Sequence, residues 1–130
     1  MYKSAQAVLQ AWVEGVNGAD LDSLSALYHP EAILLPTFSY KKLTTEAAIL
    51  DYFVQLSSRS GLAVELHDNT LRTQNYAGHV EVISGIYRWR FEVEDEPLSF
   101  EARFSFMVDL SNERPIVHHH SSQVPRGMVP

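Results

Sequence analysis

Cysteine is missing from this sequence of 130 residues. Its absence excludes disulfides, thiolate zinc sites and cysteine nucleophiles, and it is in keeping with a reducing compartment. The first residues, MYKSAQAVLQAW, also lack the basic segment, apolar block and cleavage site of a secretory signal. Apolar runs such as Ala32–Leu35 are far too short to cross a bilayer. We therefore expect a cytoplasmic protein that does not contact a membrane.

Basic residues are few. The chain has 10 Lys and Arg against 16 Asp and Glu, which gives a formal net charge of −6. Phosphate backbones are bound by basic stripes, so nucleic acid is not an expected partner. The one dense charge run is acidic, and it lacks the residue pattern of a calcium-binding loop. We interpret this run, Glu92, Glu94, Asp95 and Glu96, as the solvated tip of a hairpin.

The first half of the chain has helical periodicity. Val8, Leu9, Trp12, Val13 and Val16 repeat at the spacing of one helix face, which predicts a helix from Ser4 to Val16. A second, short helix is predicted to open at Asp20 and to end before Pro30, and YHPEAILLP then turns into a strand. A third helix, TEAAILDYFVQLSS, is predicted over residues 45–58 with Thr44 or Thr45 as its cap.

Beyond Gly61 the apolar residues alternate at a spacing of two, which is typical of strands. The pattern continues through SGIYRWRF, FEARFSFMVD and IVHHHSS, with turn residues between these runs. The chain is thus predicted to form a single α+β domain over residues 1–130, with three N-terminal helices packed on a strongly curved antiparallel sheet. Gly85, inside a strand, is the expected place of a bulge or kink.

Four segments resemble one family. LLPTFSYKKLTTEAAILDYF, SGIYRWRF, FEARFSFMVD and above all IVHHHSSQVP are similar to the nuclear transport factor 2-like superfamily. Within it, they resemble the bacterial stand-alone relatives of the calcium/calmodulin-dependent protein kinase II association domain. Arg114 and Pro115 depart from the family's pattern, which usually has Trp two residues before the closing-strand Ile. The resemblance implies a cone-shaped fold, a pocket between sheet and helices, and homodimers or larger rings formed through the outer sheet face.

Arginines within apolar strands are costly to bury unless they are paired. Arg103 matches an arginine that contributes to the pocket in the kinase association domains, and the resemblance extends this role, less directly, to Arg88. Guanidinium groups suit a small organic anion because they donate two parallel hydrogen bonds. The alternative is an internal ion pair with Glu101 or Glu81.

The histidine triplet divides between the two faces of the closing strand. His118 and His120 project to one face and His119 to the other, so the triplet cannot be a three-histidine metal site, and no metal is expected. In one interpretation His118 and His120 line the pocket and His119 faces the partner subunit. In the other, all three form hydrogen bonds within a half-buried sheet. Tyr28 and Tyr52 either line the same pocket or pack in the core.

Two classes of function remain open from the sequence. The first is a domain for oligomerisation and small-ligand binding, with a pocket for a small organic anion formed by Arg103, Arg88, His118, His120, Tyr28 and Tyr52 and with no cofactor. The second is an isomerase, dehydratase or cyclase in which an inward histidine is the general acid/base. The second class requires a carboxylate beside that histidine, for which Asp51, Glu101 and Asp109 are candidates. A purely structural assembly module would need no polar pocket.

Overall fold

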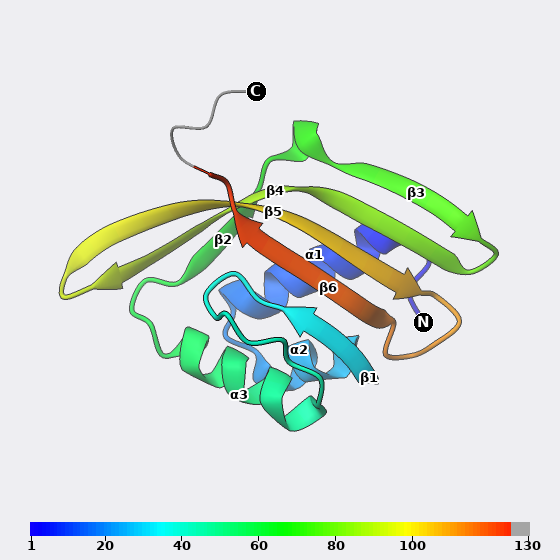
Figure 1. Ribbon diagram of the computed structural model, residues 1–130, viewed down its shortest axis with the longest axis horizontal. Coiled ribbons are helices and arrows are strands. Elements are labelled where there is room, and N and C mark those ends of the chain that lie inside the picture. Colours follow the sequence, from blue (N-terminus) through cyan, green and yellow to red (C-terminus); the bar gives the residue numbers. More distant parts are fainter. Residues whose placement is uncertain (126–130) are drawn as a thin grey trace.

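Three helices cover one face of a curved six-stranded sheet in the computed structural model, which describes residues 1–125 (Figure 1). The helices are α1 (Ala5–Asn17), α2 (Leu21–Leu27) and α3 (Glu46–Ser57). The strands are β1 (Tyr28–Leu35), β2 (Ala63–Leu66), β3 (Arg72–Ala77), β4 (Val80–Val93), β5 (Glu96–Asp109) and β6 (Ile116–Gln123), and a 3₁₀ turn, η1 (Asp68–Thr70), follows β2. The α+β class and the three-helix arrangement are confirmed.

Each helix begins at a polar cap that the sequence predicts. The side chains of Ser4, Asp20 and Thr45 accept hydrogen bonds from backbone N–H groups in the first turns of α1, α2 and α3. Gly15 lets α1 and α2 approach closely, since a Cβ there would lie 3.0 Å from Leu24. Trp12, on the same helix, is completely buried against the sheet.

The sheet is mixed rather than wholly antiparallel. Its strand order is β1-β6-β5-β4-β2, and β1 runs parallel to its neighbour β6. The other pairings are antiparallel, as predicted. Parallel neighbours need a long crossover connection, and here residues 36–115 lie between the two strands. Pairing between such distant segments leaves no hairpin signal in the sequence.

Strand β3 was not predicted, because all six of its residues are exposed and carry no apolar alternation. It shares one edge of β4 with β2, and the chain crosses from one to the other next to Gly85. Of the bulge or kink predicted at Gly85, the bulge is wrong, since β4 and β5 pair without a break from Val80 to Val93. The glycine is needed for close approach instead: a Cβ there would lie 2.8 Å from Leu71 Cδ2 and 3.0 Å from Thr70 Oγ1.

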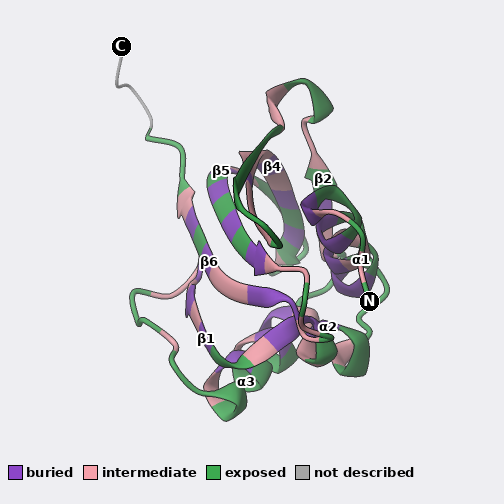
Figure 2. Cartoon of the chain, turned by 90° about the vertical axis from the view of Figure 1, so that its right-hand side faces the viewer, coloured by how far each residue is buried: buried purple, intermediate pink, exposed green. Residues whose placement is uncertain are grey.

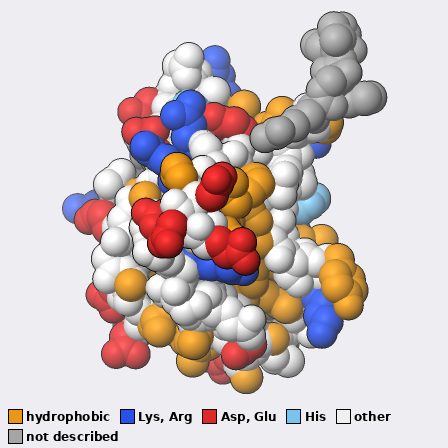
Figure 3. All heavy atoms as spheres, turned by 90° about the vertical axis from the view of Figure 1, so that its left-hand side faces the viewer, with side chains coloured by type: hydrophobic (Ala, Val, Ile, Leu, Met, Phe, Trp, Pro, Cys, Tyr) orange, Lys and Arg blue, Asp and Glu red, His pale blue; other side chains and the backbone are white. Residues whose placement is uncertain are grey.

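The β4–β5 hairpin projects well beyond the helices (Figure 1). Its two-residue turn, Glu94 and Asp95, has positive φ angles of 52° and 66°, as a type I′ turn requires. Acidic side chains gather on the face at this end of the molecule (Figure 3). Because Glu92, Glu94, Asp95 and Glu96 are all exposed, the interpretation of this run as a solvated tip is confirmed.

The core lies between the helices and the inner face of the sheet, where buried and exposed residues alternate along β5 (Figure 2). The inward residues of β4 and β5 are largely aromatic. Trp12 stacks on Tyr87 with ring centroids 5.3 Å apart and meets Phe106 edge-on. This aromatic cluster fills most of the space between α1 and the sheet.

Candidate functional site

The sequence-predicted pocket residues do not converge on one cavity. Arg88, Arg103, His118 and His120 lie on the outer face of the sheet, opposite the helices. His119, expected outside in the pocket interpretation, is instead 2% exposed and faces the core. The prediction that His118, His120 and Arg103 line an internal pocket is therefore wrong. Tyr28 and Tyr52 are the two predicted residues that lie on the inner side.

A bulge in β6 explains this reversal. Val108 pairs with Ile116 but Met107 pairs with His118, so Val117 is an extra residue on the β6 side. Strict alternation from the buried Ile116 would place His118 and His120 inside. One extra residue shifts the phase, so that His119 and Ser121 point inward instead.

Arg88 forms an ion pair on the outer face, one of the alternatives left open by the sequence. Its Nε donates to Glu101 Oε1 at 2.9 Å, and His67 Nε2 lies 2.7 Å from Glu101 Oε2. Partial burial raises the pKa of Glu101, but the hydrogen bonds from Arg88 and His67 outweigh it, so the pKa lies below its ordinary value. Glu101 is thus occupied on the outer face and does not reach the inward histidine.

His119 is the centre of a buried hydrogen-bonded chain. The Trp12 indole N–H, which can only donate, donates to Tyr28 Oη at 3.0 Å. Tyr28 Oη lies 2.8 Å from His119 Nδ1, and Tyr87 Oη lies 3.2 Å from His119 Nε2. Both ring nitrogens of His119 are therefore within hydrogen-bond distance of tyrosine hydroxyls.

Burial lowers the pKa of His119 well below its ordinary value, so the imidazole is neutral at physiological pH. Burial likewise raises the pKa of Tyr28 and that of Tyr87 above their ordinary values. The ring of His119 stacks on Phe106 with centroids 3.7 Å apart. Within residues 1–125, the side chains hydrogen-bonded to His119 are both tyrosines, and no carboxylate is among them.

A small cavity lies beside this chain, in the interior of the cone. The interior cavity has a volume of about 10 Å³, comparable to the space one water molecule needs. Its lining residues come from α1, β1, the following loop, α3, β4 and β6: Trp12, Leu34, Pro36, Thr37, Tyr52, Phe53, Tyr87, Trp89, His119 and Ser121. Aromatic side chains thus nearly fill the space between sheet and helices where a ligand pocket was expected.

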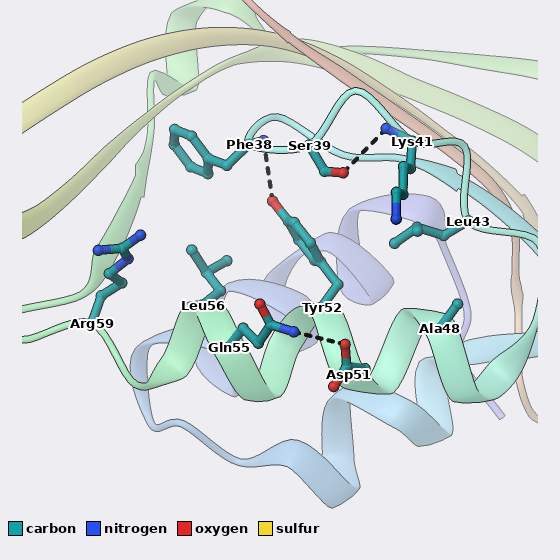
Figure 4. Close-up of a pocket in the computed structure, with 10 residues that line it drawn as sticks. All are labelled: Phe38, Ser39, Lys41, Leu43, Ala48, Asp51, Tyr52, Gln55, Leu56 and Arg59. Carbon is teal, nitrogen blue, oxygen red and sulfur yellow. Dashed lines mark hydrogen bonds between the residues drawn. The ribbon is translucent and has the colours of Figure 1, made fainter.

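A larger concavity lies outside the cone, between α3 and the loop that follows β1. This α3 groove has a volume of about 420 Å³, and Tyr52 lines both it and the interior cavity. Figure 4 shows Arg59 and Lys41 toward its two ends, with apolar side chains between them. Its lining residues are Phe38, Ser39, Lys41, Leu43, Ala48, Asp51, Tyr52, Gln55, Leu56 and Arg59.

Phe38 lines the α3 groove and packs against Trp89, which lines the interior cavity. Its ring meets Trp89, Phe91 and Phe100 edge-on, with centroids 5.3 to 5.6 Å apart. Its backbone N–H donates to Tyr52 Oη at 3.3 Å, the hydrogen bond drawn in Figure 4. Phe38 is half-buried.

Similarity to known proteins agrees with this architecture. The model of a protein family described as a SnoaL-like domain matches residues 5–127. The chain belongs to the SnoaL-like family. No curated protein is significantly similar in sequence to this SnoaL-like chain.

Solved structures share the SnoaL-like fold at low identity. A protein from Xanthomonas campestris, described as a calcium/calmodulin dependent protein kinase II association domain, has a TM-score of 0.82 and 21% identity, over 93% of this chain and 86% of its own. A dehydratase-like protein of the NTF2-like family from Streptomyces avermitilis has a TM-score of 0.78 and 12% identity, over 92% and 93%. A SnoaL-like polyketide cyclase homologue from Shewanella putrefaciens has a TM-score of 0.65 and 15% identity, over 95% and 91%. The predicted nuclear transport factor 2-like fold is confirmed.

Several residues of the SnoaL-like chain's site were missed by sequence reasoning. Phe38, Lys41 and Arg59 belong to loops or to the end of a helix, where no periodicity indicates which way a side chain points. Trp89 follows the strand alternation of SGIYRWRF, which indicates a buried residue but not a site residue. The TFSYKKL segment between a strand and a helix is the one signal that indicates a functional loop.

Two further observations on the SnoaL-like chain concern metal ions and membranes. Among residues 1–125, no three His, Asp or Glu side chains are placed so as to hold a metal ion. None of the helices in this same part of the chain is long and apolar enough to cross a membrane.

Proposed function

We propose that the chain binds a small organic anion with an apolar body in the α3 groove, without catalysing a reaction on it. The observation that carries this proposal is the composition of the groove. Phe38, Tyr52 and Leu56 supply apolar surface, and Arg59 and Lys41 supply positive charge toward its ends. Pockets for small molecules combine these features, with apolar walls for affinity and a few polar groups for orientation.

The charge balance of the groove favours an anion. Lys41 and Arg59 carry two positive charges, and Asp51 is the one acid among the lining residues. Asp51 accepts a hydrogen bond from Gln55 Nε2 at 2.8 Å along the exposed side of α3. Arg59 lies over the ring of Phe91, 5.7 Å from the centroid, which holds its guanidinium beside the groove. An aromatic carboxylate fits both the charge and the apolar surface of the α3 groove.

The surroundings of His119 argue against the enzyme alternative. A general base needs access to substrate and a pKa near the working pH. His119 is 2% exposed, and burial lowers its pKa well below the ordinary value. Both ring nitrogens already contact tyrosine hydroxyls. Asp51 and Glu101, two of the acids considered as partners, are hydrogen-bonded elsewhere, to Gln55 and to Arg88 and His67.

The anion proposal is tested by thermal shift with benzoate and other aromatic carboxylates. Benzoate is expected to raise the melting temperature of the wild type, and Arg59→Gln and Lys41→Gln are expected to reduce that rise. Lys42→Gln is the matched control, since it removes a neighbouring charge that does not line the α3 groove. A benzoate shift that is the same in all four proteins would refute the proposal.

A second candidate function, homodimer formation, is favoured by the outer face of the sheet. Val82, Met107, His118 and Ile33 are cross-strand neighbours in one row, and Met107 is 38% exposed. The apolar members of such a row are suited to a partner surface of the same kind. Sedimentation equilibrium is expected to give a dimer mass for the wild type and a monomer mass for Met107→Glu. Tyr76→Ser, at the exposed β3 edge, should remain dimeric; a monomeric wild type at micromolar concentration would contradict this candidate.

A further inference from the structure

A further concavity lies on the outside of the cone, between the loop that follows β1 and the C-terminal end of β6. Leu34 and Leu43 exchange two backbone hydrogen bonds of 2.8 and 2.9 Å, so the loop between them, residues 35–42, folds back on itself. Because β6 runs parallel to β1 and Leu35 pairs with His120, the last residues of β6 extend beyond β1 and lie beside this loop (Figure 1). The β1–β6 pocket between loop and strand has a volume of about 370 Å³.

The lining of the β1–β6 pocket carries positive charge and no negative charge. Lys41 and Lys42 come from the loop and His120 from β6, and no Asp or Glu of residues 1–125 lines the pocket. The hydroxyl of Ser122 and the amide of Gln123 add hydrogen-bond donors from the end of the same strand. This composition is opposite to that of the whole chain, whose formal net charge is −6.

Lys42 and Tyr40 are the two side chains of the loop that the protein itself does not occupy. None of the ion pairs among residues 1–125 includes Lys42. Figure 4 shows the Lys41 side chain running toward Leu43 on the groove side, whereas Lys42 does not line the α3 groove. Tyr40 lines the β1–β6 pocket and is 95% exposed, so the faces of its ring are open to a planar ligand.

We propose that the β1–β6 pocket binds a phosphate monoester carried on a small aromatic ring, with Lys42, His120 and Ser122 around the phosphate. The Tyr40 ring stacks on the ring of the ligand. A phosphate monoester has close to two negative charges at neutral pH and three terminal oxygens that accept hydrogen bonds. It can therefore take donors from the loop and from β6 at the same time, which the two oxygens of a carboxylate do less well.

The size and the position of the pocket agree with this ligand class. Pockets of a few hundred Å³ hold small organic molecules, and about 370 Å³ accommodates one ring with its phosphate. The β1–β6 pocket shares only Ser39 and Lys41 with the α3 groove among the lining residues that the structure describes. The inference is therefore independent of the proposed function, and the two sites bind different anions.

The test follows backbone amide signals by NMR while phenyl phosphate is added at constant ionic strength. Phenyl phosphate is expected to move the signals of Lys42 and Ser122 in a saturable way. Phenyl sulfate, which has the same ring and terminal oxygens but a single charge, should bind about fivefold more weakly. The inference is overturned if the two signals do not saturate with phenyl phosphate, or if phenyl sulfate binds equally well.

A lysine pair tests whether the phosphate contact is local. Lys42→Gln is expected to weaken phenyl phosphate binding about fivefold, because it removes a charge-assisted hydrogen bond at the surface. Lys3→Gln is the matched control, since it removes the same charge from a residue that does not line the pocket. Lys42 is exposed, so its replacement should not disturb folding. Equal weakening by both substitutions would mean attraction by net charge alone and would refute the site.

A tyrosine pair tests the stacking contact. Tyr40→Ser should weaken phenyl phosphate binding about threefold and leave the affinity for inorganic phosphate unchanged, because only phenyl phosphate carries a ring. Tyr76→Ser, which removes another strongly exposed tyrosine, should affect neither ligand. Unchanged binding of phenyl phosphate to Tyr40→Ser would refute the part of the ring in this site.

Arg59→Gln separates this inference from the proposed function. Benzoate binding is expected to depend on Arg59, and phenyl phosphate binding on Lys42. If phenyl phosphate instead depends on Arg59 and moves the signal of Gln55, it occupies the α3 groove and the β1–β6 site is refuted. If benzoate does not bind while phenyl phosphate binding depends on Lys42, the anion groove is refuted and the β1–β6 site stands.

Discussion

Tyr28 Oη on β1 lies 2.8 Å from Nδ1 of His119 on β6, deep in the core between two parallel neighbouring strands. The two residues are 91 positions apart in sequence. Tyr28 also accepts the Trp12 indole N–H, so one hydroxyl ties α1, β1 and β6 together. A polar network of this kind is costly to disrupt, because each lost member leaves a buried partner unsatisfied.

Replacement of His119 is expected to be strongly destabilising. His119→Phe keeps a ring against Phe106 but leaves the hydroxyls of Tyr28 and Tyr87 without their partner, at a cost of about 2 to 4 kcal/mol in the free energy of unfolding. Urea denaturation, monitored by tryptophan fluorescence, measures this loss in the free energy of unfolding. His120→Phe, the exposed neighbour, should change stability by less than about 0.5 kcal/mol. Similar losses in both variants would contradict the network.

Stability should fall as the pH drops below about 6.5, the ordinary pKa of histidine. Burial lowers the pKa of His119 in the folded protein, so the unfolded chain binds a proton there that the folded chain does not. The stabilisation is complete above 6.5 and decreases by up to about 1.4 kcal/mol per pH unit below it. Urea midpoints between pH 8 and 5 test this slope.

His118 contributes to that slope in the same direction, because burial, followed by the charge of His120, lowers its pKa as well. His119→Phe should therefore remove most of the slope, and His118→Gln a smaller part. A pH profile of His119→Phe that parallels the wild type would show that another group is responsible.

Gly85→Ala should destabilise the sheet edge by about 1 to 3 kcal/mol, because the added Cβ would meet Leu71 Cδ2 at 2.8 Å. Chemical denaturation of single and double variants measures the effect. In a Leu71→Ala background the same substitution should cost less, since its closest neighbour is gone. Equal costs in both backgrounds would refute steric contact as the reason for this glycine.

The hairpin tip offers a stabilising change. Asp95 has a φ of 66°, a conformation in which a side chain is strained and glycine is not. Asp95→Gly is expected to raise the free energy of unfolding by about 0.5 to 1 kcal/mol and to complete a more favourable type I′ turn. Asp95→Ala, which removes the same charge but keeps a Cβ, is the control. If the two variants are equally stable, charge rather than backbone conformation determines the effect.

Local sequence patterns predicted the helix starts, the two longest strands and the family of this protein. Ser4, Asp20 and Thr45 open the helices as predicted, since a cap depends on residues only three positions away. Alternation in SGIYRWRF and FEARFSFMVD predicted the two longest strands. The same segments, with IVHHHSS, indicated the family. The polar strand β3 and the parallel pairing of β1 with β6 depend on distant partners and left no local pattern.

Which residues form the candidate site depends on the tertiary structure. Strand alternation divided His118 and His120 from His119, but it cannot determine which face is the inner one. That depended on Val117, the extra residue of a bulge that exists only when β6 pairs with β5. The α3 groove depends likewise on how a loop lies over a helix, because Phe38 and Arg59 approach each other only through packing on Phe91. The sequence pattern determined that His119 lies on the opposite strand face from His118 and His120. Long-range strand pairing determined that His119 is the one in the core.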